Sequence, residues 1–504
     1  MDPARQTKLN KRDNGGTDIA AAAPKRGIPA LVLDTFTDAL FIGKVLTIAL
    51  PVALQNLLNT VTNMIDTIMI GSLGASTIAA VGLANKYFFV FGLLVFGICS
   101  GSGVLSAQFY GNRDLANIRR VLGLTVIMAS IGAVFFMVPG FFTPDTVMRI
   151  FTTSTDAQAI GVRYLRIVVF SYWFMAVNVA MVQMMRTVGS AQAPVFTSIL
   201  AIAVNIFLNY TLIFGHFGAP RLGVEGAALA TLAARIAEFI ALLIVMVHIK
   251  VPHDFSEDTE RPGQRIENSV YVFRGRVKEF IGWNSRFLGS FFSTSVPVIF
   301  NEFMWGLGTT LYSVAYGRMG DNAVAAVTIS STIEELMMVL WFGLSAATSV
   351  ILGNELGAGK LKEAEDHAAK FCVVSVVMSL AVMLLLFLIR RPITSLFAVG
   401  PEVEELVVKI LNVLIIVFIP KMLNNIIVVG ILRAGGDTRW CLFIDTSGVW
   451  CVGVPLAFLG ALYWHLPIHV VFFLVCIEEI YKMFFGLWRV SRKKWLRNIA
   501  IEVQ

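Results

Sequence analysis

The chain repeats most of its first half in its second half. Pro51 recurs as Pro297 and Gly71 recurs as Gly317, a constant shift of 246 positions. The same shift relates further pairs: Gly97 and Gly343, Val104 and Val350, Gly111 and Gly357. Further along the shift becomes 247, and Arg186 recurs as Arg433. Repeats of about 20–50 residues build solenoids, so this much longer period indicates a duplicated domain.

Both copies are too apolar for a water-soluble domain. Of the 504 residues, 57% are hydrophobic and 14% are charged, whereas a soluble domain has about 25% charged residues. A helix needs about 20 mostly apolar residues to cross a bilayer. By that measure we predict twelve spanning helices, at 42–70, 77–107, 120–142, 160–185, 195–215, 225–249, 287–316, 323–352, 370–389, 403–431, 438–463 and 467–488.

The distribution of basic residues predicts an orientation for these helices. With both tails in the cytoplasm, most Lys and Arg fall on the inner side. The outer loops then hold only Arg149, Arg221, Arg318, Arg390 and Arg391, as the positive-inside rule requires. Six spans is an even number, so both copies insert the same way. We therefore predict an all-α integral membrane protein with two six-helix lobes, related by a pseudo-twofold axis along the membrane normal.

The expected domain boundaries follow from this plan. A polar N-terminal tail, expected in the cytoplasm, precedes the first span. The cytoplasmic linker between the lobes is charged and contains Pro and Gly, and a short interfacial helix is expected at 270–281. The divisions are an N-terminal tail at 1–40, an N-lobe at 41–250, a linker at 251–286, a C-lobe at 287–489 and a cytoplasmic C-terminal tail at 490–504.

Several other classes of protein are excluded or disfavoured. The net charge of +7 could suggest nucleic-acid binding, but the basic residues lie in short loops and tails rather than on one folded patch. The five cysteines lie in apolar segments, and their spacing suits neither a disulfide framework nor a zinc site. No His-Glu-x-x-His, Gly-x-Ser-x-Gly or Walker sequence occurs. We therefore predict neither an enzyme nor a primary pump.

Three stretches resemble one family of transporters. They are Pro51 to Gly71 with its Asp66-Thr-Ile-Met-Ile-Gly71 end, Asn205-Ile-Phe-Leu-Asn209 followed by Gly226 to Thr231, and Leu432-Arg433-Ala-Gly-Gly436-Asp437-Thr438. Together with the duplicated twelve-span plan they resemble the multidrug and toxic compound extrusion (MATE) family. The resemblance implies a central cleft between two lobes, and export of amphipathic, often cationic, organic compounds against an inward flow of H⁺ or Na⁺.

The resemblance also implies a cation site in the N-lobe. Ionisable groups inside a membrane are costly, so each is a candidate functional group, and Asp66 lies in the outward half of the first span. Asn205 and Asn209 are four residues apart and share one helix face, and Thr231 offers a hydroxyl. The predicted cation-coupling residues are Asp66, Asn205, Asn209 and Thr231, with Na⁺ at the first three as the possible metal. Some members carry Asp at the position of Asn209, and the two asparagines could instead join helices by hydrogen bonds.

The C-lobe supplies a second set of acids. Glu302 follows Pro297 by five residues, and Lys421 is its possible partner. Asp445 fits either a proton path or a hydrogen bond to a neighbour. The predicted substrate or proton candidates are Glu302, Glu334, Glu335 and Asp445, and the predicted hinges are Pro51 and Pro297.

Seven other charged residues are interpreted as structural. Glu478 and Glu479 are expected to pair with Lys482, and Arg235 with Glu238. Arg186 and Arg433 are expected to anchor helix ends to phosphate headgroups and carbonyls.

The leading functional hypothesis is a secondary antiporter that works by alternating access. We expect small organic molecules as substrates, contact with membrane lipids, no nucleic acid, no cofactor other than the coupling ion, and a monomer in the bacterial inner membrane. A flippase or exporter of a lipid-linked or anionic metabolite is the alternative, although the mostly acidic intramembrane charges favour cationic substrates. An intramembrane enzyme is a weaker alternative, because no nucleophile–base pair is evident.

Overall fold

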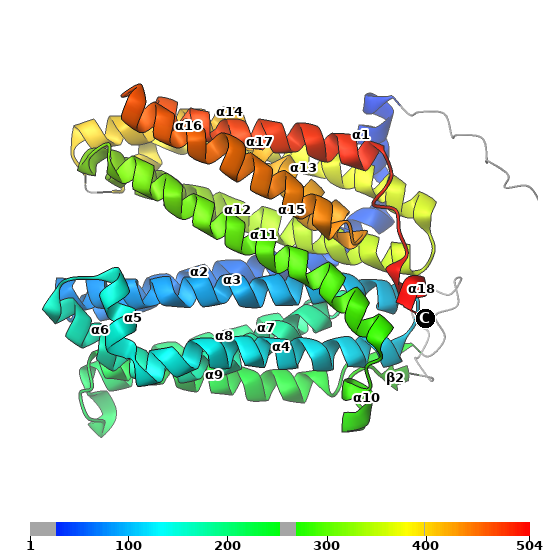
Figure 1. Ribbon diagram of the computed structural model, residues 1–504, viewed down its shortest axis with the longest axis horizontal. Helices are drawn as coiled ribbons and strands as arrows, with labels where there is room; N and C mark the ends of the chain where they lie inside the picture. Colours follow the sequence, from blue (N-terminus) through cyan, green and yellow to red (C-terminus); the bar gives the residue numbers. More distant parts are fainter. Residues whose placement is uncertain (1–26, 253–268, 398, 504) are drawn as a thin grey trace, which may run out of the picture.

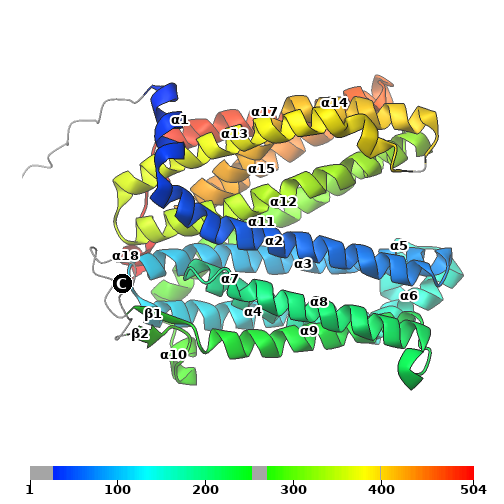
Figure 2. The same cartoon turned by 180° about the vertical axis from the view of Figure 1, so that it is seen from behind.

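The structure is a computed structural model that describes residues 27–252, 269–397 and 399–503. Long helices run side by side and form two stacked groups (Figure 1). The described ends of the chain lie at the same end of the bundle, which we call the terminal end, and α5 and α6 lie at the opposite end (Figures 1 and 2). Residues 1–26 of the predicted N-terminal tail and 253–268 of the predicted linker lie outside the described residues.

The first group contains the helices of the N-terminal half except α1, which lies against α13 of the second group (Figure 2). A short helix that the sequence analysis did not expect, α1, precedes the first predicted span. The bounds are α1 Ile28–Thr37, α2 Ala39–Gly71, α3 Ala75–Gly111, α4 Leu115–Phe142, α5 Pro144–Phe151, α6 Thr155–Val168, α7 Phe170–Thr187, α8 Ala193–Phe214 and α9 Val224–Met246. A 3-10 turn at His216–Gly218 follows α8.

The second group contains the C-terminal half and repeats this order. The bounds are α11 Ser285–Gly317, α12 Asp321–Gly357, α13 Leu361–Thr394, α14 Pro401–Asn424, α15 Thr438–Ser447, α16 Val454–Phe458, α17 Ile468–Ser491 and α18 Ile499–Val503. Three π-helical segments extend these helices: η3 Asn425–Leu432, η4 Gly448–Gly453 and η5 Leu459–Tyr463. The predicted all-α fold with twelve long spans is confirmed.

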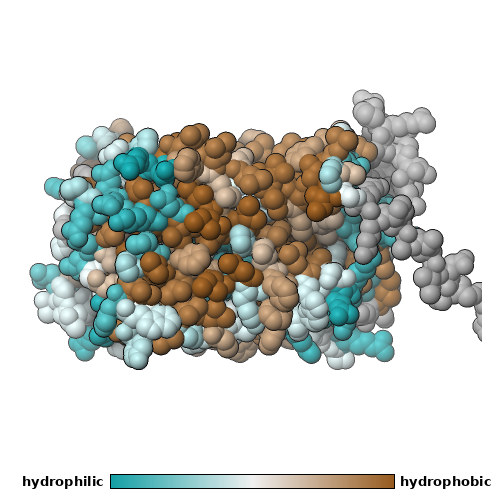
Figure 3. Space-filling model, turned by 90° about the horizontal axis from the view of Figure 1, so that it is seen from above, coloured by the Kyte–Doolittle hydropathy of each residue, from teal (hydrophilic) through white to brown (hydrophobic). Residues whose placement is uncertain are grey.

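Nine helices among the described residues are long and apolar enough to cross a membrane, and the pair α6–α7 makes a tenth. That pair was predicted as one continuous span, but it bends by 51° between Val168 and Phe170. The other two long helices, α11 and α17, lie in the same bundle but carry more polar side chains. On the face drawn in Figure 3, hydrophobic residues gather across the middle of the molecule and hydrophilic residues lie mostly toward its two ends. Large side chains such as Phe135, Leu384 and Ile416 are exposed in the spans, as expected where lipid replaces water.

The segment between the lobes differs from the sequence expectation. The short helix expected over 270–281 occupies only the last part of that range, α10 Val277–Ile281, and an antiparallel strand pair, β1 Lys250–Pro252 and β2 Ser269–Tyr271, precedes it. Arg119 of α4 explains the position of this segment. Its guanidinium donates to the backbone oxygens of Tyr271 and Val272 and pairs with Glu279. These bonds satisfy backbone carbonyls that a helix would have used internally.

The two lobes touch most closely where α3 crosses α12. A Cβ atom added at Gly111 would lie 1.9 Å from the backbone oxygen of Asn354, and one added at Gly357 would lie 2.0 Å from the backbone oxygen of Gln108. These contacts are copies of each other, because the shift of 246 relates Gln108 to Asn354 and Gly111 to Gly357. The duplicated glycines therefore allow two backbones to meet at the pseudo-twofold axis.

A second symmetric pair of contacts closes the same interface. A Cβ atom at Gly97 would lie 2.7 Å from the Cα of Ile299 in α11, and one at Gly343 would lie 3.1 Å from the Cβ of Ala53 in α2. The repeat relates Gly97 to Gly343 and Ala53 to Ile299. From these contacts the helices of the two lobes diverge toward the opposite end (Figures 1 and 2). The lobes are thus closed against each other at the terminal end.

The C-terminal segment joins the lobes at that end. The side-chain nitrogen of Gln108 in α3 donates to the backbone oxygen of Ala434 (2.7 Å), and its oxygen accepts from the backbone N–H of Ile499 (2.6 Å). Asn498 donates to the backbone oxygen of Gly357 (2.9 Å). The segment predicted as a C-terminal tail therefore packs into the interface rather than extending away from it.

Candidate functional site

A cavity of about 630 Å³ lies inside the N-terminal lobe, between α2, α3, α6, α7, α8 and α9. Its apolar part is aromatic and includes Phe88 and Tyr172, whose ring centroids are 5.3 Å apart. Its polar part is rich in amides and hydroxyls. The polar and charged side chains that line it include Asn59, Thr62, Asn63, Asp66, Asn85, Ser171, Ser198, Asn205, Asn209, Thr231, Arg235 and Glu238.

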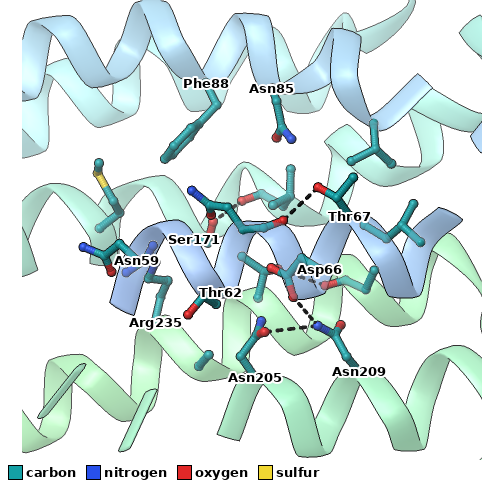
Figure 4. A pocket seen from close by; sticks show the side chains of 18 of the residues that line it. Asn59, Thr62, Asp66, Thr67, Asn85, Phe88, Ser171, Asn205, Asn209 and Arg235 are labelled. Carbon is teal, nitrogen blue, oxygen red and sulfur yellow. Dashed lines mark hydrogen bonds between the residues drawn. The ribbon is translucent and has the colours of Figure 1, made fainter. Parts of the chain in front are cut away.

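Asp66 lies on the cavity wall and is held by α8 (Figure 4). Asn209 donates from Nδ2 to Oδ1 of Asp66 (2.6 Å) and to Oδ1 of Asn205 (3.1 Å). Asn205 and Asn209 are buried on one face of α8, one turn apart, as their spacing predicts. The structure therefore brings three of the four predicted cation-coupling residues into contact.

Thr231 lines the same cavity but does not join this chain of hydrogen bonds. Its hydroxyl donates to the backbone oxygen of Ala227 one turn earlier in α9 (3.0 Å). The fourth predicted residue is therefore near the site, and its hydroxyl oxygen keeps a lone pair for a ligand.

The asparagine pair leaves one oxygen without a partner. Oδ1 of Asn209 is buried and accepts no hydrogen bond. An unpaired buried acceptor is costly, and either a hydrogen-bond donor or a hard cation would remove the cost. The Asp66 carboxylate can bind a proton or Na⁺, and this amide oxygen is a second oxygen ligand suited to Na⁺. No cluster of three or more His, Cys, Asp or Glu suited to a metal ion occurs among the described residues, so amide oxygens would have to complete any Na⁺ site.

A second charged group in the cavity wall is already neutralised. Arg235 donates to Oε2 of Glu238 (2.9 Å), one turn along α9, as the sequence predicts. Asn178 also donates to Oε2 of Glu238 (3.2 Å), and Ser198 donates to Oε1 (3.3 Å). The sequence analysis missed that this pair lies in the cavity, because helical spacing pairs the two residues without showing which neighbours surround them.

The C-lobe acids do not gather around this cavity. Glu302 is buried and accepts from Nη2 of Arg433 (2.7 Å), so the predicted partner Lys421 is wrong for it. Lys421 pairs instead with Glu334, whereas Glu335 is exposed. Glu302 and Glu334 thus form pairs inside the C-lobe, and neither they nor Glu335 line the cavity.

Asp445 belongs to a polar network that has an equivalent at the same repeat positions of the other lobe. In the C-lobe, Asn301 donates to Asp445 (2.9 Å), beside the pair of Glu302 and Arg433. In the N-lobe the equivalent positions hold Gln55, Ser198 and Arg186. Gln55 donates to Ser198 (2.9 Å) and accepts from Arg186 (2.5 Å). Of the alternatives for Asp445, the hydrogen bond to a neighbour is the one that the structure contains.

The two repeated arginines both point into this network: Arg186 is half-buried and Arg433 is buried. Arg433 is 2% exposed and also donates to Ser100 of α3 in the other lobe (3.1 Å). In place of the expected phosphate headgroups and carbonyls, Arg186 donates to Gln55 and Arg433 donates to Glu302, both inside the bundle. Comparing the repeat position by position would have indicated this, because polar partners occur at matching places on the first and fifth helices of each copy.

The C-terminal copy of the repeat has no acid at the position that corresponds to Asp66. The equivalent position in α11 is Tyr312, whose hydroxyl donates to Glu478 of α17 (2.6 Å). Lys482 pairs with Glu478 (3.3 Å), as the sequence predicts, and Glu479 instead accepts from Asn424 (2.9 Å). The two lobes are alike in backbone but not in chemistry, and only the first encloses the cavity described above.

A duplicated bundle of membrane-spanning helices, with one lobe built around a polar cavity, defines a multi-pass membrane transporter rather than an enzyme. Comparison with known families identifies the family of transporters to which the chain belongs. The MatE family model matches twice, at residues 51–211 and 297–459, once in each copy. The chain belongs to this family, the multidrug and toxic compound extrusion transporters.

Individual relatives agree with this assignment. The chain is 27% identical to a probable multidrug resistance protein NorM of Bradyrhizobium diazoefficiens, over 87% of this chain and 89% of the relative. It is 25% identical to a probable multidrug resistance protein YoeA of Bacillus subtilis, over 83% and 86%. Among solved structures, the Vibrio cholerae MATE transporter VcmN in a mutant form is similar in fold, with a TM-score of 0.80 at 16% identity, over 92% of this chain and 98% of that one.

Proposed function

We propose that this transporter is an antiporter in which Asp66 carries the coupling cation, H⁺ or Na⁺, and amphipathic organic cations are exported in exchange. One observation carries the proposal. Of the charged side chains that line the cavity, Asp66 is the carboxylate without a cationic partner, since Glu238 is paired with Arg235. An unpaired acid in a membrane is costly unless it binds something during the cycle.

The contacts of Asp66 make its occupancy sensitive to conformation. Its carboxylate joins α2 to α8 through the hydrogen bond from Asn209, and α2, the helix that carries Asp66, also packs against α12 of the other lobe. A cation that binds the two lobe arrangements with different affinity shifts the balance between them. Pro51 in α2 and Pro297 in α11 lie inside continuous helices and lack the backbone donor, so we propose them as hinges.

The cavity wall supports the substrate class. Aromatic rings and apolar side chains, with one uncompensated negative charge, suit an organic cation that has an apolar body. The relatives named as multidrug resistance proteins agree with this class. A flippase for a lipid-linked or otherwise anionic metabolite is a weaker candidate, because the one cationic side chain of the cavity lining, Arg235, is engaged by Glu238.

The surface supports a location in the bacterial plasma membrane with the terminal end in the cytoplasm. The basic loops of both halves lie at that end, as the positive-inside rule requires. The lobes are closed at the terminal end and diverge at the other, so this arrangement corresponds to an outward-facing state that releases substrate. We propose that the transporter works as a monomer, because the cavity is lined within one lobe of one chain.

The test uses purified protein in liposomes loaded with a fluorescent organic cation. A pH gradient and a Na⁺ gradient are imposed one at a time, and efflux is followed. Efflux that responds to one gradient identifies the coupling ion, and efflux that ignores both contradicts the proposal. A preliminary measurement is thermal stability, because a cation that binds the native state must raise it by mass action.

A further inference from the structure

The cavity contains an unusual combination of charges. Three of its lining side chains are ionisable as acids or strong bases: Asp66, Arg235 and Glu238. Two negative charges and one positive charge leave a single net negative charge. The effective dielectric inside a protein is lower than in water, which strengthens the interaction of such a charge with a bound cation.

Arg235 is the part of this combination that faces the open space. Its side chain is 35% exposed, while Glu238, its partner at 2.9 Å, is 6% exposed. Glu238 is also held by Asn178 and Ser198, so both of its oxygens are satisfied. Glu238 therefore fixes Arg235 in place within the lining of the cavity.

The surrounding side chains place no other cation there. The cavity lining from α2, α3, α6, α7 and α8 supplies amides, hydroxyls, aromatic rings and aliphatic groups around Asp66 and Arg235. Any cationic substrate thus shares the cavity with a guanidinium fixed to the wall. A substrate with one positive charge balances the net charge, while a substrate with two leaves one charge uncompensated and close to Arg235.

We infer that Arg235 is a specificity-determining residue that restricts the cavity to substrates with a single positive charge. This inference rests on the proposed function and names its substrate class more narrowly. Arg235 neutralises Glu238, so the cavity keeps one uncompensated carboxylate, Asp66, to balance one positive charge of a substrate. Removing its charge should make room for dications without changing the shape of the cavity.

The experiment measures equilibrium binding of two matched probes to purified protein in lipid nanodiscs, with no gradient. The probes are N-methyl-4,4′-bipyridinium, with one positive charge, and N,N′-dimethyl-4,4′-bipyridinium, with two. Wild type should prefer the singly charged probe. Arg235→Gln should shift the ratio of the two dissociation constants toward the doubly charged probe by about tenfold, the size expected for one charge across a cavity.

Two further variants separate charge from structure. Arg235→Lys keeps the charge and should keep the wild-type ratio. The double variant Arg235→Gln with Glu238→Gln removes both charges and restores the net charge of the cavity, so its ratio should return toward that of wild type. Thermal unfolding of each variant reports whether the change at Glu238 has weakened the fold.

The inference is overturned if Arg235→Gln leaves the ratio unchanged, if Arg235→Lys shifts it equally, or if neither probe binds any variant. Failure of the proposed function would look different. Efflux would then ignore both ion gradients while the binding ratio still depended on Arg235, because the ratio is measured at equilibrium.

Discussion

Adding one methyl group at Gly357 should open the transporter at its terminal end. The Cβ of Gly357→Ala would lie 2.0 Å from the backbone oxygen of Gln108. Real Cβ atoms do not approach a neighbour closer than 3.0 Å, so α12 and α3 must separate by at least the difference, about 1 Å. Overpacking of this kind costs about 1–3 kcal/mol.

That cost falls only on the arrangement in which the lobes touch. It should therefore change the ratio of terminally closed to terminally open molecules by about 5- to 150-fold. Pulsed electron paramagnetic resonance can measure the change between spin labels at two exposed positions, Lys278 in α10 and Lys362 in α13, in a background without the native cysteines. Gly357→Ala should add a longer distance to the distribution.

Two comparisons test the reasoning. Gly111→Ala should act in the same direction, because its Cβ would lie 1.9 Å from the backbone oxygen of Asn354 at the symmetric contact. Gly289→Ala in α11 is the control, since nothing lies within 4 Å of its Cβ. A distance distribution for Gly357→Ala identical to that of wild type and Gly289→Ala would refute the argument.

Three other predictions concern the closed end and the buried pairs. Gln108→Ala removes the hydrogen bonds that hold Ile499 and Ala434, so the C-terminal segment should become more accessible to proteases; unchanged cleavage would contradict its bridging role. Arg433→Met leaves Glu302 buried and unpaired and should cost about 3–5 kcal/mol of stability. The double variant Arg433→Met with Glu302→Gln should cost less. Equal melting temperatures for the two variants would show that Arg433 and Glu302 do not form a charged pair. The hydrogen bond from Lys370, and then that from the Phe41 backbone, hold the pKa of Asp38 below its usual value of 3.8. The stability that Asp38 contributes is therefore present above that value and is lost as pH falls through the lowered pKa. Hydrogen exchange should show that Asp38→Asn loosens α1 at neutral pH but not in strong acid.

The sequence predicts the fold well because hydrophobic length is a local property. Each predicted span matches one helix or a run of consecutive helical segments. The repeat relates Gly111 to Gly357, but the symmetric contacts that these glycines make are seen only in the structure. What it cannot predict is the break at Val169 between α6 and α7, since nothing there is a proline or glycine. The strand pair at 250–252 and 269–271 is likewise too short to leave a periodic pattern.

The candidate site likewise has features that the sequence predicts and features that it does not. Asn205 and Asn209 share a helix face by spacing alone, and the resemblance adds Asp66, so three residues that meet in space are predictable. The partners of Glu302 and Lys421 are not, because a charged side chain in a bundle can reach several helices. Which lobe encloses the cavity depends on side-chain packing between helices, and neither spacing nor composition reports that.

Coupling at Asp66 is tested most directly by comparing two kinds of transport in the same proteoliposomes. Exchange of labelled for unlabelled substrate needs only that the lobes alternate, whereas accumulation against a concentration gradient needs the ion. Asp66→Asn should retain exchange and lose accumulation driven by either ion gradient. If Asp66→Asn still accumulates substrate at the wild-type rate, the coupling ion is carried elsewhere and the account is wrong.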